Sequence, residues 1–62
     1  MRIKGNTIEW KGSHLRLKRS YREWVVWCGQ KCIATGRTKA ETVENLRAYL
    51  SEVERGNKVL GH

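Results

Sequence analysis

Residues 22–41 read REWVVWCGQKCIATGRTKAE and contain the change of hydrophobic period that decides the fold. The first part is rich in β-branched and aromatic residues, which favour an extended strand. Gly29-Gln30 then supplies a short turn, and residues 31–35 supply a second strand. This part of the chain is therefore predicted to form an antiparallel hairpin.

The end of the same stretch begins a helix. Thr38 and Glu41 have the spacing of a capping box, in which two side chains satisfy free backbone amides at a helix start. Behind them, apolar residues recur at steps of three and four and form one stripe: Ala40, Val43, Leu46, Leu50 and Val53. Gly56 is a typical helix stop. A helix is therefore predicted over about residues 39–55.

Upstream of the hairpin, residues 14–19 alternate between apolar and polar side chains, as a strand with one buried face does. Residues 7–12 are a further candidate strand. The predicted fold is α+β, with a three-stranded antiparallel sheet packed on one C-terminal helix, or a four-stranded sheet if the N-terminal segment also pairs. The single small domain covers residues 1–62, with the sheet at about 7–36, the helix at about 39–55 and a tail at 56–62.

A helix with one apolar stripe covers only one face of such a sheet. Alternation predicts that the covered face carries Leu15, Leu17, Trp24 and Val26. The opposite face is predicted to be open and to display Arg16, Lys18, Val25 and Trp27. The register of the last turn decides whether Lys31 and Ile33, or Cys32 and Ala34, join the open face, and the sequence leaves this undecided.

Charge is segregated along the chain, which has 13 basic and 6 acidic residues and a formal net charge of +7. Residues 1–40 hold ten basic and two acidic residues (+8), whereas residues 41–62 hold three basic and four acidic residues (−1). A cationic surface concentrated on one structural half is typical of proteins that bind polyanions.

The cysteines and histidines do not form a convincing metal or redox site. Cys28 and Cys32 miss the redox C-x-x-C spacing by one residue, and only His14 and His62 are available to complete a zinc site of four ligands. A disulfide between the two cysteines would close too short a loop to add much stability. We therefore expect reduced thiols, no metal and no cofactor.

An enzyme is not predicted either. The chain is too small for a deep pocket, which argues against a small-molecule substrate, and it has no plausible triad or pair of carboxylates. It lacks an apolar run long enough for a membrane span and the apolar core of a signal peptide. We expect a cytoplasmic protein, in a bacterium or in an infected host cell.

The open face is the candidate binding surface. Arginine and lysine neutralise phosphates, and an aromatic ring offers apolar area to sugars and bases. The candidate base-reading residues are Arg16, Lys18 and Trp27. The candidate phosphate contacts lie near strand ends and turns: Lys11, Arg19, Arg22, Lys31, Arg37 and Lys39. Trp27 has an alternative position beneath the N-terminal segment beside Trp10, and Tyr21 and Tyr49 are expected to pack at the rim.

The segment REWVVWCGQKCIATGRTKAETVENLRAYLSEVERG resembles the arm-type DNA-binding domain at the N-terminus of phage and transposon tyrosine recombinases. The likeness extends over residues 14–56. The matching positions are Trp24 and Val26, Gly29 and Lys31, Gly36, Thr38-Lys39 with Glu41, and Glu54 with Gly56. The resemblance implies a three-stranded sheet in the major groove with a helix behind it. By position, the groove-facing residues would be Arg16, Lys18, Arg22, Val25, Trp27 and Lys31.

Two features depart from that family. Its second strand usually alternates basic residues, whereas this chain has Glu23, Val25 and Trp27 there. No recombinase catalytic domain follows, so we expect a free-standing phage or mobile-element factor or an excised domain. The predicted function is double-stranded DNA binding, sequence-specific or sequence-tolerant.

An acidic protein and RNA are the alternative partners. The same face is suited to an acidic protein, as in a small phage-encoded inhibitor, and residues 32–50 are similar to HicB-type antitoxins without their acidic, glycine-rich core pattern. RNA is the weaker nucleic-acid candidate because the chain has no ribonucleoprotein aromatic motif and no phenylalanine.

Overall fold

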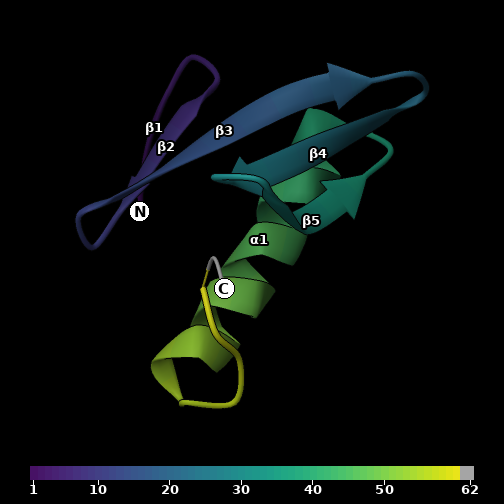
Figure 1. Cartoon of the computed structure of the whole chain (residues 1–62). Coiled ribbons are helices and arrows are strands. Elements are labelled where there is room, and N and C mark those ends of the chain that lie inside the picture. The colour runs from purple at the N-terminus through teal and green to yellow at the C-terminus, as the bar shows by residue number, and fades with distance from the viewer. Residues whose placement is uncertain (61–62) are drawn as a thin grey trace.

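The protein folds as one antiparallel sheet and one helix in a computed structural model that describes residues 1–60 (Figure 1). The strands are β1 (Arg2–Lys4), β2 (Thr7–Trp10), β3 (Ser13–Ser20), β4 (Glu23–Cys28) and β5 (Lys31–Gly36), and the helix is α1 (Lys39–Glu54). The five strands lie side by side in chain order, so each one forms a hairpin with the next.

The predicted number of strands was wrong, because the sheet has five strands and not three or four. The candidate strand at residues 7–12 is β2, which ends at Trp10. The strand that the sequence did not predict is β1, in which Ile3 pairs with Ile8. Its three residues are all exposed, and the alternation Arg2-Ile3-Lys4 is too short for a strand to be recognised from it. The α+β class with a C-terminal helix agrees with the structure.

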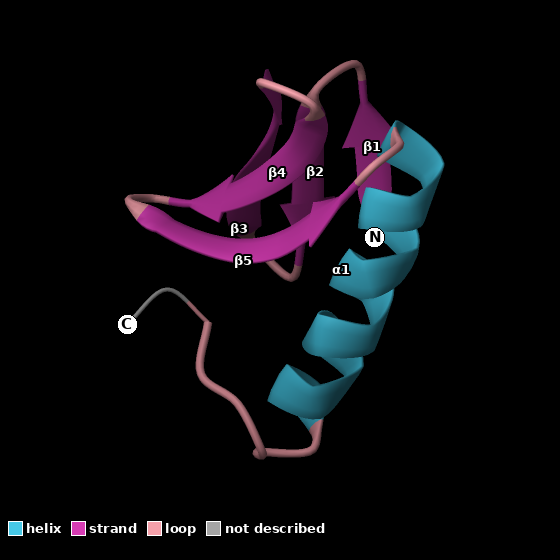
Figure 2. Cartoon of the chain, turned by 90° about the vertical axis from the view of Figure 1, so that its right-hand side faces the viewer, coloured by secondary structure: helices cyan, strands magenta, loops and turns pink. Residues whose placement is uncertain are grey.

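The helix covers one face of the sheet, as Figure 2 shows from the side. The core between the two layers consists of Ile8, Leu15, Leu17, Val26, Ile33, Ala34, Leu46 and Leu50. Trp10, Trp24 and Tyr49 pack against it at its margins. The predicted stripe of α1 is right at Leu46 and Leu50 but wrong at Ala40, which is exposed. Thr42 is buried instead, because its side chain hydrogen-bonds within the first turn and lies against Gly36.

Both ends of α1 are capped. The Thr38 hydroxyl accepts a hydrogen bond from the backbone N–H of Glu41 (3.1 Å), which confirms the predicted N-cap. At the other end Gly56 has a φ of +80°, and its N–H donates to the carbonyl of Val53 while the next N–H donates to the carbonyl of Glu52. These two bonds form a Schellman motif. The helix therefore ends at Glu54, one residue earlier than predicted.

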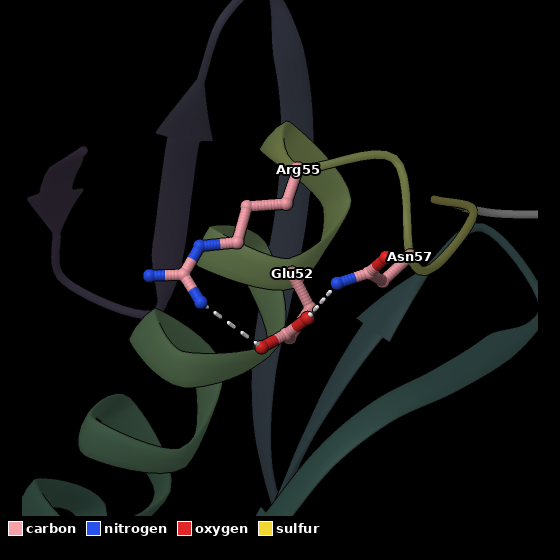
Figure 3. A network of polar contacts seen from close by, with 3 residues as sticks. All are labelled: Glu52, Arg55 and Asn57. Carbon is pink, nitrogen blue, oxygen red and sulfur yellow. Dashed lines mark hydrogen bonds and ion pairs between the residues drawn. The ribbon is translucent and has the colours of Figure 1, made fainter.

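Side chains also support the turn that follows the C-terminal end of α1 (Figure 3). The carboxylate of Glu52 accepts a hydrogen bond from the Asn57 amide (2.7 Å) and lies 3.7 Å from the Arg55 guanidinium. Beyond it, the Tyr49 hydroxyl donates to the carbonyl of Val59 (2.7 Å), and Leu60 packs against the core. The described part of the predicted tail therefore folds back towards the sheet, and residues 61–62 lie outside the described residues.

Gly36 ends β5 where the chain passes closely over α1. A Cβ added there would lie 2.6 Å from Oγ1 and 2.8 Å from the backbone nitrogen of Thr42. Because backbone cannot move aside as a flexible side chain does, Gly36→Ala is expected to destabilise the fold by about 1–3 kcal/mol. Urea denaturation followed by circular dichroism measures this loss. An unchanged midpoint would contradict the close packing of β5 on α1.

Candidate nucleic-acid interface

The register of β3 and β4 places the predicted site residues on one face. Arg16 pairs with Trp27, and Lys18 pairs with Val25. Residues that pair directly across two strands point to the same side of the sheet. Between these pairs, Leu17 is opposite Val26 and points to the helix. Leu17 and Val26 therefore point to the covered face and Arg16, Lys18 and Trp27 to the opposite face, as predicted. Val25, which was predicted to be displayed with them, is buried (6% exposed).

The row of paired residues continues into β2 and then into β1. Thr7 of β2 is opposite Arg16, and Lys4 of β1 is opposite Thr7. We call the surface formed by Lys4, Thr7, Arg16, Lys18, Val25 and Trp27 the open face. The sheet twists strongly, so that the β1–β2 hairpin lies at an angle to β3 and β4 and the open face is curved (Figure 1). Lys4 is a functional candidate that was missed, and its only signal was the alternation of residues 2–4.

A second row borders the open face near the β1 edge. Glu9 is opposite both Arg2 on β1 and His14 on β3. The carboxylate therefore lies between two nitrogen-bearing side chains and lowers the positive field there. On the other side of Arg16, around Lys18, the next carboxylate on this face is that of Glu23, the first residue of β4. The strongest cationic part of the surface is consequently formed by Lys4, Arg16 and Lys18.

Trp27 lies half-buried in the open face beside the basic residues. Together with Arg16, Lys18, Gly29 and Gln30 it lines a shallow hollow of about 300 Å³. The alternative position, packed beside Trp10, was wrong. Trp10 pairs with Ser13 and packs against the core on the covered side, whereas Trp27 pairs with Arg16 on the opposite side.

A β-bulge in β5 determines which of its residues reach the open face. The pairing shifts between Val26 and Trp27, so that Ala34 is opposite Val26 and Cys32 is opposite Trp27. Ile33 is the extra residue and is buried in the core. Cys32 thus joins the open face. Lys31 is opposite Cys28 at the end of the hairpin. This pair belongs to the covered face, so Lys31 is not on the same face as Arg16.

The other predicted contacts are dispersed. Arg19 is opposite Trp24, on the register of the covered side, and is exposed. Lys39 at the start of α1 donates to the carbonyl of Gly5 (3.3 Å) and lies 3.4 Å from the side-chain oxygen of Asn6.

Lys11 is also engaged away from the open face. Its Nζ is 3.2 Å from a carboxylate oxygen of Glu54 and 5.4 Å from the ring centre of Trp10. Arg22 and Arg37, in contrast, line one hollow at the β3–β4 turn. The structure thus brings together Arg16, Lys18 and Trp27, and separately Arg22 and Arg37.

The two cysteines are free thiols and occupy registers on opposite faces of the sheet. No group of three or more His, Cys, Asp or Glu side chains that could hold a metal ion occurs among residues 1–60. His62, the other histidine considered as a ligand, lies outside the described residues. In the same part of the chain, α1 is neither long nor apolar enough to cross a membrane.

Comparison of the chain with protein-family models, with curated proteins and with solved structures gives no match. The resemblance to the arm-type domain of tyrosine recombinases therefore stays a prediction that depends on the quoted residues alone.

Proposed function

We propose that this protein binds double-stranded DNA through the open face of its sheet. The observation that carries the proposal is the cross-strand row Lys4, Thr7, Arg16 and Trp27, with Lys18 in the neighbouring row. Basic side chains at fixed spacing neutralise phosphates, and a neighbouring indole supplies apolar contact to sugars or to a thymine methyl group.

The dimensions of the row suit a duplex. Neighbouring strands are about 4.8 Å apart, so the step from β1 to β4 covers about 14 Å along the row. The major groove is about 12 Å wide and admits a two-stranded ribbon. If β3 and β4 enter the groove, Arg16, Lys18 and Trp27 face the base edges. Lys4 is then displaced by two strands from Arg16, in a position to meet the phosphates that border the groove.

The face offers little to an acidic protein partner beyond its charge. Ile33 is buried in the core, and Val25 is only 6% exposed. Stable protein interfaces depend on a few large apolar anchors, and only Trp27 remains to serve as one. These positions favour DNA over an inhibitor-like or antitoxin-like role.

Duplex binding is expected to depend steeply on salt. If about five phosphates are neutralised, the affinity should fall about five-hundredfold between about 50 and 200 mM monovalent salt, because bound counterions are released. A fluorescence-anisotropy titration of a labelled duplex at several salt concentrations measures this slope. The same titration with single-stranded DNA and with RNA of equal length tests the class of nucleic acid. A chain that binds no duplex, or binds single strands more tightly, would overturn the proposal.

A further inference from the structure

The turn between β3 and β4 carries an unusual residue at its tip. Ser20 pairs with Glu23, so Tyr21 and Arg22 form a two-residue loop. Tyr21 has a φ of +57°, in the left-handed region, and its side chain is 92% exposed. The rim-packing position expected for this tyrosine was therefore wrong, because its ring lies in solvent.

In two other hairpins of the sheet the first loop residue, which is the position of Tyr21, is a glycine. The first loop residue is Gly5 between β1 and β2 and Gly29 between β4 and β5, and both have positive φ. Glycine is favoured there because a Cβ strains a left-handed backbone. Lys11 also has positive φ, and its side chain lies beside Glu54 and Trp10. Tyr21 has no comparable side-chain contact within residues 1–60.

The surroundings of Tyr21 are cationic. Tyr21, Arg22 and Arg37 line a hollow of about 370 Å³, together with Ser20 and Glu23. Arg37 comes from the segment that follows β5, so two elements place guanidinium groups beside the tyrosine. Glu23 contributes one carboxylate, which leaves an excess of one positive charge. We call Tyr21, Arg22 and Arg37 the hairpin tip.

We propose that the hairpin tip is a second contact site for DNA, specific for the sugar–phosphate backbone. The tyrosine ring packs on a deoxyribose, its hydroxyl donates to a phosphate oxygen, and the two guanidiniums bind phosphates of the same strand. This inference rests on the proposed function of the open face. The hairpin tip ends the ribbon of β3 and β4 on the side away from the β1–β2 hairpin (Figure 1). A ribbon lying in the groove presents such an end to the strand that borders the groove.

A strained, exposed aromatic residue that makes no packing contact lowers the stability of the free protein, and contact of its ring with a ligand would offset that cost. The backbone is the favoured target because the hairpin tip combines ring, hydroxyl and guanidinium groups. Phosphate and sugar accept all of these contacts irrespective of base sequence.

The test is Tyr21→Gly in the full chain, measured for stability and for duplex binding. Relief of the left-handed strain is expected to raise the melting temperature by about 5 °C. Loss of the ring and hydroxyl is expected to weaken duplex binding about five- to tenfold, equally for every duplex sequence, with an unchanged salt slope. Tyr21→Phe keeps the ring and should give a smaller loss. Arg22→Ala and Arg37→Ala should each lower the salt slope by about one.

The outcomes separate this inference from the proposed function. If Tyr21→Gly binds duplex as tightly as the unmodified protein while Arg16→Ala weakens binding, the hairpin tip is not a contact and the inference is overturned. If the melting temperature does not rise in Tyr21→Gly or in Tyr21→Asn, which also tolerates positive φ, the strain on which the inference depends is refuted. If the unmodified protein binds no duplex, the proposed function fails first. Higher stability together with weaker binding is the result that supports the proposal.

Discussion

Replacing Arg16 and Lys18 together by glutamate is expected to lower duplex affinity at least about a hundredfold. Each basic contact to DNA contributes about 1–3 kcal/mol, and every 1.4 kcal/mol corresponds to a factor of ten in affinity. The substitution also places two carboxylates beside Trp27 in the centre of the open face, where they repel phosphates. Anisotropy titration of a labelled duplex at low salt measures the loss.

The matched control is Arg47→Glu with Arg55→Glu, which changes the net charge by the same amount on the helix side of the molecule. Both residues are exposed, and the ion pair of Arg55 with Glu52 is a surface pair that contributes little to stability. The control is expected to reduce affinity only slightly. If both double variants lose the same factor in duplex affinity, the binding reflects net charge alone and the open face is not the contact surface.

Melting curves of all variants should be similar, because surface substitutions change stability by about 0.5 kcal/mol or less.

The second large effect is expected from Leu46→Ala, which should remove about half of the protein's free energy of unfolding. Leu46 is completely buried at the centre of the face that α1 presents to the sheet. Truncating a buried leucine costs about 2–5 kcal/mol. The stability expected for a chain of this length is only about 3–9 kcal/mol. Thermal unfolding followed by circular dichroism measures the change.

Leu46→Met is the matched control, since it keeps the volume of the side chain and should cost less than about 1.5 kcal/mol. Equal melting temperatures for the alanine and methionine variants would contradict a core centred on this residue. Duplex binding should follow the folded fraction in both variants, because the basic row of the open face exists only when the strands are paired.

The central hairpin and the helix could be predicted because their hydrophobic periods are long and undisturbed. Leu15 and Leu17 alternate with Arg16 and Lys18, and the same period of two continues through Trp24 and Val26. One face of this alternation had to be buried, so the assignment of faces followed directly. The N-cap at Thr38 could also be predicted, because capping depends on local sequence.

The remaining features depend on contacts that local sequence does not encode. The three exposed residues of β1 form a strand only because β2 offers an edge to pair with. Thr42 is buried because Gly36 lets β5 approach α1 closely, which no helical period reveals. The positive φ of Tyr21 is set by the length of a loop whose first residue is ordinarily glycine.

The shared direction of Arg16, Lys18 and Trp27 on β3 and β4 could be predicted, whereas the burial of Val25 and the covered register of Arg19 could not. A position on a strand fixes the direction of a side chain, whereas proximity to a turn does not, and Lys11, Lys31 and Lys39 were assigned by their proximity to turns or strand ends. The bulge at Ile33 reverses the alternation in β5 and sends Lys31 to the covered register. Lys4 was overlooked together with the strand that carries it.

The most direct test of the central claim is a titration of the ¹⁵N-labelled protein with a short duplex, followed by amide and indole chemical shifts. We expect the largest shifts at Thr7, Arg16, Lys18 and the indole N–H of Trp27, with the middle of α1 unchanged. Shifts confined to α1, or no saturable shift at the open face, would contradict the claim that this face of the sheet binds DNA.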